Sequence, residues 1–155
     1  MKTVQHYFQS IFCLCICAFL LVSCHNEESD SLGNWKPIKW EETDYEQVKE
    51  DGNDYFSVSS DGGSFQFHCK NYDIITFLVG EVKQEGEASL HIPFDEEKSI
   101  GKYFKIAEND IFDVVVEGGD VSVTIKPNNG TVRFVDIEIA YGDVRSFLRF
   151  KQRTI

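Results

Sequence analysis

Hydrophobic and polar residues alternate with a period of two along most of the chain after residue 35. Such alternation is typical of β-strands that bury one face, and no stretch of this region keeps a helical period. A denser apolar run at 74–82 predicts a strand that is buried on both faces. The other strands are expected at 56–59, 64–69, 112–116, 121–126, 135–139 and 144–150, with weaker candidates at 88–94 and 100–107.

Glycine, asparagine and aspartate punctuate these runs at positions where tight turns are expected. The segment 127–130 reads Pro-Asn-Asn-Gly, which predicts a hairpin because Asn-Gly tolerates positive φ. The segment 51–54 predicts a solvated turn, since it lacks the length and closing glutamate of a calcium loop. A short helical turn is expected only at 45–49. About seven to eight short antiparallel strands with such turns predict an all-β, immunoglobulin-like β-sandwich.

The N-terminus carries the signature of an exported protein. After Lys2, residues 11–22 form an uncharged run of twelve apolar residues, too short for a membrane span of about 20 residues but suited to a signal peptide. The run ends in Leu-Val-Ser-Cys, which resembles the lipobox of bacterial lipoproteins. This resemblance implies a signal peptide at 1–23 and a lipid on Cys24, the only covalent group expected. An ordinary signal peptide that happens to contain a cysteine is the alternative.

A polar stretch follows the cysteine, so 24–34 is expected to be a flexible acidic tether and 35–155 the folded domain. Glu-Glu-Ser-Asp at 27–30 resembles the surface-export tag of Bacteroidetes lipoproteins, which implies a domain anchored in the outer membrane and facing the cell exterior. A merely solvated tether is the alternative. Ser31 lies in an Asp-Ser-Leu triplet that resembles a short O-glycosylation motif of the same bacteria.

Net charge limits the range of possible binding partners, and cysteine content limits the possible disulfides. Without residues 1–23 the chain has 14 basic and 26 acidic residues, a net charge of −12, which repels nucleic acid and favours neutral or cationic partners. Beyond the signal peptide only Cys24 and Cys69 remain, so no internal disulfide is expected. Cys69 shares the strand face of Phe65 and Phe67, and a buried, inert thiol is the favoured interpretation over a reactive one.

Three segments carry a family resemblance. Residues 61–72, DGGSFQFHCKNY, and residues 121–152 resemble Bacteroidetes lipoproteins with BACON-type immunoglobulin-like domains, and the opening WKPIKW at 35–40 resembles the start of such lipoproteins. The landmarks within 121–152 are Asn128, Arg133, the Gly-Asp turn at 142–143 and a closing Gln152. The family is associated with carbohydrate-related proteins, which implies a binding module or a spacer. Many members carry tryptophans after the Asn-Tyr turn, whereas residues 73–76 have none.

The sequence contains no recognisable catalytic or metal motif, and we therefore expect a protein that is not an enzyme. His68 and His91 are isolated, so structural or solvated roles are favoured over metal binding. Aromatic side chains are the remaining ligand candidates, because sugar rings stack on them, although core packing or capping of the sandwich end is the favoured alternative. The candidates near predicted turns or edges are Trp35, Trp40, Tyr72 and Tyr103.

Two functions are therefore predicted from different classes. The first is a lipid-anchored cell-surface module that binds glycans or acts as a spacer in a glycan-handling complex. The alternative is a protein–protein interaction subunit of an outer-membrane or surface-fibre assembly, which requires a long unpaired edge strand or a missing strand.

Overall fold

The structure is a computed structural model that describes residues 35–101 and 104–154. The predicted signal peptide, Cys24, Ser31 and Tyr103 lie outside the described residues. Within them the regular structure consists of ten strands and no helix, which confirms the all-β fold but exceeds the expected seven to eight strands. The strands are β1 Gln47–Glu50, β2 Asn53–Val58, β3 Gly63–His68, β4 Thr76–Gln84, β5 Leu90–Pro93, β6 Phe104–Glu108, β7 Phe112–Glu117, β8 Asp120–Ile125, β9 Arg133–Tyr141 and β10 Val144–Gln152.

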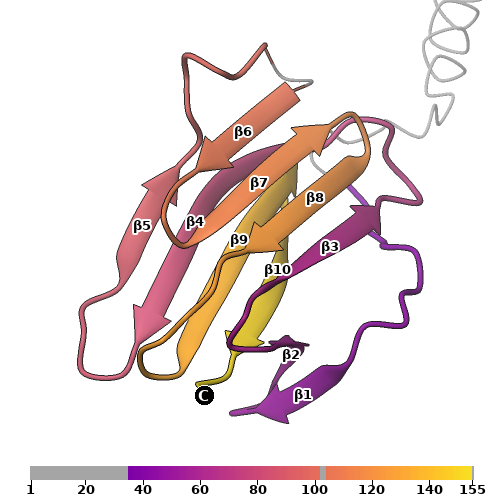
Figure 1. The fold of residues 1–155 in the computed structure, drawn as a ribbon. Helices are drawn as coiled ribbons and strands as arrows, with labels where there is room; N and C mark the ends of the chain where they lie inside the picture. Colours follow the sequence, from indigo (N-terminus) through magenta and orange to yellow (C-terminus); the bar gives the residue numbers. More distant parts are fainter. Residues whose placement is uncertain (1–34, 102–103, 155) are drawn as a thin grey trace, which may run out of the picture. The chain divides into compact units, whose positions relative to one another are not determined.

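The strands form two sheets that pack as a sandwich (Figure 1). One sheet has the order β1-β2-β10-β9-β4-β5, and the other has the order β3-β8-β7-β6. All pairs are antiparallel except β2 and β10, which run parallel and pair Phe56 with Phe150. The expectation of purely antiparallel strands is wrong at this one pair, because an early and the last strand of the chain meet side by side.

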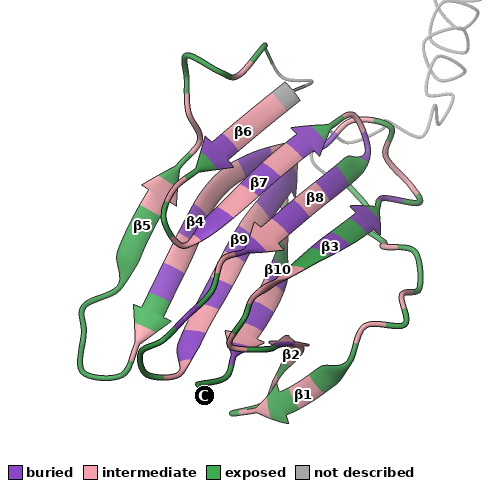
Figure 2. Ribbon diagram, viewed as in Figure 1, coloured by how far each residue is buried: buried purple, intermediate pink, exposed green. Residues whose placement is uncertain are grey.

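Alternation along the strands builds the core, and Figure 2 shows it as buried and less buried bands along β7, β8 and β9. Most inward residues are apolar and meet inward residues of the opposite sheet, which removes a large nonpolar area from water. The buried polar exceptions on the strands are Arg133 of β9 and Gln152 of β10. The fully buried aromatic side chains are Phe77, Phe112 and Phe150. Cys69 is also buried, at 3% exposure, as the favoured interpretation predicted.

The run at 74–82 is not buried on both faces as predicted. In β4, Phe77, Gly80 and Val82 are buried, whereas Glu81 on the other face is only partly covered. A register irregularity between Phe77 and Val79 shifts which side chains point inward. Gly80 faces Phe112 of the opposite sheet so closely that a Cβ there would lie 2.3 Å from the ring Cζ.

The predicted hairpin at 127–130 is wrong. The segment connects β8 to β9, which belong to different sheets, and Gly130 does not adopt the left-handed conformation. The buried Asn128 holds this crossing instead: its backbone N donates to Ser60 O at 2.7 Å, and its Nδ2 donates to Thr131 O at 2.8 Å. A local turn signal cannot distinguish a hairpin from a connection between sheets, since both need a sharp change of direction.

The predicted helical turn at 45–49 is also wrong, because these residues lead into the edge strand β1. The turn expected at 51–54 is present. Asp51 and Gly52 have φ of 49° and 80° and join β1 to β2, with Glu50 paired to Asn53. Two consecutive residues with positive φ suit a tight hairpin between twisted strands.

No helix within the described ranges is long and apolar enough to cross a bilayer.

Candidate functional site

The segment that precedes β1 is fixed to the sandwich by the Asn-Tyr turn after β3. Asn71 accepts a hydrogen bond from Lys39 N at 2.9 Å through Oδ1 and donates to Pro37 O at 3.0 Å through Nδ2. The Tyr72 hydroxyl donates to Lys36 O at 2.6 Å. These bonds hold the segment in one position, so the two tryptophans at its ends are also fixed.

Trp35 and Tyr72 come together through Tyr141, the last residue of β9. The Tyr72 and Tyr141 rings stack with centroids 3.9 Å apart, and Trp35 meets Tyr141 edge-on at 5.1 Å. Trp35 also covers Gly142, where a Cβ would lie 3.1 Å from the indole. Trp35 remains 43% exposed, whereas Tyr72 is partly covered and uses both its ring face and its hydroxyl within the protein.

Trp40 joins the two sheets. Its backbone forms a β-bridge with Cys69 just beyond β3, its ring meets the Phe67 ring at 6.1 Å, and its Nε1 donates to Ser146 Oγ on β10 at 3.1 Å. The side chain is half-buried. It therefore contributes both to capping of the sandwich, as the favoured alternative predicted, and to the wall of a recess.

That recess, which we call the Trp40 pocket, has a volume of about 390 Å³. This lies within the range of about 300–1,000 Å³ that is common for small-molecule sites. Aromatic rings and polar side chains share its wall, a combination that offers apolar stacking beside hydrogen-bonding groups. The lining residues are Trp40, Glu41, Glu42, Thr43, Gln47, Phe56 and Phe67.

Sequence reasoning identified only Trp40 among these residues. The pocket is formed by the segment leading into β1 together with β2 and β3, so it depends on contacts between distant parts of the chain. The available signal was the adjacency of Trp40 to Glu41 and Glu42, because ligand sites combine aromatic side chains with a few polar groups.

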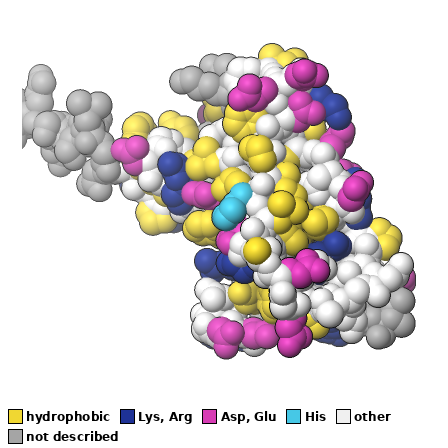
Figure 3. Space-filling model, turned by 90° about the vertical axis from the view of Figure 1, so that its left-hand side faces the viewer, with side chains coloured by type: hydrophobic (Ala, Val, Ile, Leu, Met, Phe, Trp, Pro, Cys, Tyr) yellow, Lys and Arg dark blue, Asp and Glu magenta, His cyan; other side chains and the backbone are white. Residues whose placement is uncertain are grey.

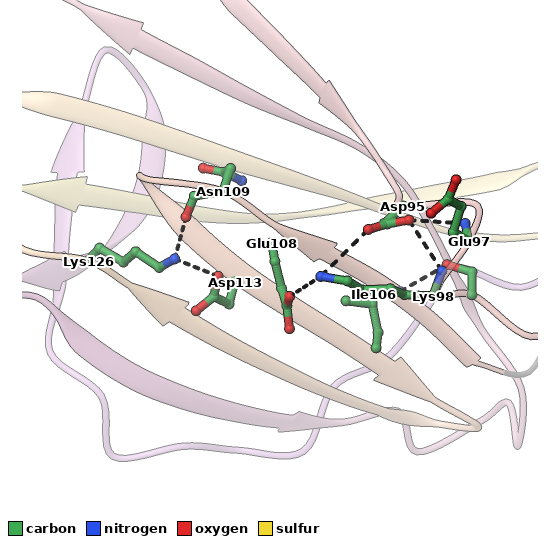
Figure 4. Close-up of polar contacts among 9 residues, drawn as sticks. Asp95, Glu97, Lys98, Ile106, Glu108, Asn109, Asp113 and Lys126 are labelled. Atoms are coloured by element: carbon green, nitrogen blue, oxygen red, sulfur yellow. Dashed lines mark hydrogen bonds and ion pairs between the residues drawn. The ribbon is translucent and has the colours of Figure 1, made fainter.

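The pocket carboxylates differ from the ion-paired acidic groups of the domain. Among residues 35–101 and 104–154, neither Glu41 nor Glu42 forms an ion pair. Figure 4 shows the opposite situation near β6 to β8, where Lys98 Nζ lies 2.5 Å from Glu108 Oε2 and Lys126 Nζ lies 2.8 Å from Asp113 Oδ1. Among the described residues, the pocket carboxylates are therefore exposed and have no Lys, Arg or His nitrogen within ion-pair distance.

One further titratable group lies beside the pocket segment. His68 Nδ1 is 2.6 Å from Asp120 Oδ1, and this hydrogen bond raises the pKa of His68, while burial has a smaller opposing effect. The carboxylates of Asp120, Glu41 and Asp73 add to the increase. The His68 carbonyl accepts a hydrogen bond from Glu41 N at 2.9 Å, so the pair and the pocket share a backbone contact.

The residues that carried the family resemblance at the C-terminal end form a buried polar cluster. Arg133 Nε donates to Gln152 Oε1 at 3.1 Å, and Arg133 Nη2 donates to Lys126 O at 2.8 Å. Gln152 Nε2 donates to Lys126 O at 2.9 Å and to Ser59 O at 3.0 Å. Burial lowers the pKa of Arg133. The hydrogen bonds tie β9, β10 and two loops together, which is a structural task.

Figure 3 shows the β5 side of the domain, where hydrophobic side chains gather between charged ones. Leu90 of this edge strand is 50% exposed, and Ile92 and Phe94 pack partly on the core. Lys105 Nζ lies 4.0 Å above the Phe94 ring. The apolar residues on this side lie at the edge of the core and are only partly covered. The Trp40 pocket is the better candidate site because its recess combines aromatic and polar side chains.

Within the described part of the chain, no group of three or more His, Cys, Asp or Glu side chains is arranged to hold a metal ion. His68 and His91 are both exposed. Cys69 Sγ lies 3.5 Å from Asn71 Oδ1, next to the turn that holds the tryptophan-bearing segment.

Comparison with known proteins identifies a structure of similar fold but does not assign the chain to a family. No family model matches the chain, and no curated protein matches it. The chain is similar to an NMR structure of a protein from Bacteroides thetaiotaomicron, with a TM-score of 0.53 and 23% identity over 82% of this chain and 95% of the other. At this identity the likeness concerns the fold alone.

Proposed function

We propose that this chain is a lipid-anchored, non-catalytic β-sandwich module of the outer cell surface that binds a glycan in the Trp40 pocket. The observation that carries the proposal is the recess of about 390 Å³ that is lined by three aromatic residues together with two carboxylates, a hydroxyl and an amide. Sugars have apolar C–H faces and hydroxyl edges, so this mixture of groups complements both.

The architecture around the pocket supports a pre-formed site. The Asn71 and Tyr72 hydrogen bonds hold the segment on one side, and Trp40 is fixed by Ser146 on the other. A ligand then loses little affinity to ordering of the protein, because these side chains already hold their positions. The lipobox at residue 24, the acidic tether and the BACON-type resemblance support the location and the association with carbohydrates.

The alternative function, a protein–protein interaction subunit, has weaker support, because the edge strands of the two sheets are short. The edge strands β1 and β5 have four residues each, and β6 has five. Short edge strands are a common protection against pairing with other chains. The edge of β3 is partly capped, because Gln66 N donates to the Tyr45 hydroxyl at 2.9 Å and Glu41 N donates to His68 O.

A matched pair of variants tests glycan binding. The mature chain, purified in detergent, is applied to a glycan array and its best ligand is titrated by calorimetry. Trp40→Ala is expected to weaken binding at least tenfold, since it removes the largest ring of the pocket. Trp35→Ala, which removes the other tryptophan outside the pocket, is expected to leave the affinity within twofold. A chain that binds no glycan, or variants that lose binding equally, would contradict the proposal.

The anchor and the location need a separate measurement. Mass spectrometry of the exported protein is expected to find acyl chains on Cys24. Cys24→Ser is expected to release the protein from membranes, because stable anchoring takes two or more buried acyl chains. Protease added to intact cells is expected to digest the domain. An unmodified residue 24 would exclude the anchor, and full protection from protease would exclude the exterior orientation.

A further inference from the structure

We infer that the Trp40 pocket selects uncharged or amine-bearing sugars against anionic sugars, and that Glu41 and Glu42 determine this specificity. The inference rests on the proposed function and deepens it, because it names the class of sugar that the pocket accepts.

The first step is the chemistry of the pocket wall. An ionised carboxylate only accepts hydrogen bonds, and a sugar hydroxyl can donate one. Bonds of this kind are charge-assisted and roughly twice as strong as neutral ones. Glu41 and Glu42 both line the pocket and both are exposed, so their oxygens are available to a ligand.

The second step is that, in the part of the chain that the structure describes, no cationic side chain in the pocket neutralises the two carboxylates. Within the described residues no Lys, Arg or His side chain lines the pocket, and neither glutamate forms an ion pair. A uronic or sialic acid would place a third negative charge against two carboxylates, and the side-chain donors that line the pocket beside them, Thr43 and Gln47, are neutral. The repulsion would act at short range, where salt screens charges less than it does at a distance.

The third step separates the pocket from the rest of the protein. The whole chain is acidic, with a formal net charge of −11, and would repel anions weakly at any point of its surface. Asp44, on the same segment as Glu41 and Glu42, and Asp54, on β2, are both exposed, form no ion pair among the described residues and do not line the pocket. They therefore provide a control with the same change in charge.

The experiment compares three forms of the mature chain: the natural sequence, the double variant Glu41→Gln and Glu42→Gln, and the double variant Asp44→Asn and Asp54→Asn. Each is titrated with a neutral oligosaccharide, its deacetylated amine-bearing form and its uronic acid form. The natural chain is expected to bind the uronic form at least tenfold more weakly than the neutral form. The pocket variant is expected to reduce this ratio to threefold or less and to lose any preference for the amine, while the control variant retains the natural ratio.

Each other outcome overturns the inference. Equal binding of neutral and anionic sugars by the natural chain would overturn it while leaving glycan binding in place. Equal relaxation in both double variants would assign the selectivity to overall charge and not to the pocket. If the natural chain bound none of the sugars on the array, the proposed function itself would fail. Circular dichroism and thermal unfolding of each variant exclude misfolding as the cause of lost binding.

Discussion

The buried Arg133–Gln152 cluster and the Trp40 pocket both contain polar side chains, but these side chains differ in burial and in hydrogen bonding. Arg133 and Gln152 are nearly inaccessible, and their hydrogen bonds run to each other and to backbone carbonyls. Glu41 and Glu42 are exposed and line a recess. Buried polar groups that are fully hydrogen-bonded stabilise and specify the fold, whereas accessible groups beside a hollow are free to meet a ligand. Accessibility therefore separates the candidate site from the structural cluster, although the cluster carries the more recognisable motif.

The largest effect on stability is expected from Gln152→Ala. The substitution removes the acceptor for Arg133 and leaves a buried guanidinium with a single carbonyl partner. Removing one partner of a buried charged hydrogen bond costs about 2–4 kcal/mol. Chemical denaturation is expected to show this loss, and the affinity of the folded fraction for a glycan should not change. A stable variant with altered binding would break the distinction between the two regions.

Trp40→Ala is expected to reverse this pattern, with a large effect on binding and a smaller one on stability. The half-buried ring and its bond to Ser146 are lost, which should lower the free energy of unfolding by about 1–2 kcal/mol. Ser146→Ala removes only the hydrogen bond and is expected to cost about 0.5–1.5 kcal/mol. Calorimetry and denaturation on the same samples separate the two readouts. A stability loss for Trp40→Ala as large as that for Gln152→Ala would assign the tryptophan to the core.

Tyr72→Phe tests one of the hydrogen bonds that hold the segment before β1 in place beside the pocket. It removes the hydroxyl that donates to Lys36 O but keeps the stack on Tyr141. The expected loss of stability is about 0.5–1.5 kcal/mol, as for an ordinary hydrogen bond. Hydrogen exchange is expected to accelerate at residues 38–41 and to stay unchanged in β9 and β10. Faster exchange throughout both sheets would contradict a local supporting role.

The smallest effect is expected from His68→Gln, and it depends on pH. Because the folded pKa of His68 is raised, its pair with Asp120 contributes fully below the unfolded value of about 6.5, and the contribution disappears as pH rises through the folded pKa. The natural chain should therefore exceed the variant in melting temperature by a small margin at pH 5.5, and the margin should vanish at alkaline pH. A margin that grows with pH would have the wrong sign.

The sandwich could be predicted from the sequence because alternation is a local property. The alternation at Phe65 and Phe67 and at Val121, Val123 and Ile125 corresponds to β3 and β8. The connection at 127–130 could not be assigned, since a turn residue does not indicate which sheet the next strand joins. The role of Tyr141 was missed for a similar reason: nothing near it in sequence indicates that Tyr72 stacks on its ring.

The pocket was predicted only in part. Trp40 was identified as a ligand candidate because it is aromatic and lies near a strand edge, but Phe56 and Gln47 join it only through the pairing of β1 with β2. The pairing of β1 with β2 was not predicted, because the polar residues at 45–49 suit a helical turn as well as an edge strand. Carboxylates are abundant in this chain, so Glu41 and Glu42 become distinctive only when a structure shows which ones line a recess.

The most direct test of glycan binding at the Trp40 pocket uses the two tryptophans of the chain as probes. Their indole N–H signals can be followed by NMR in the ¹⁵N-labelled mature chain and assigned with Trp35→Phe. On titration with a neutral oligosaccharide, the Trp40 signal is expected to shift and saturate while the Trp35 signal changes little. A Trp40 signal that stays in place at saturating glycan, or a shift confined to Trp35, would contradict the account.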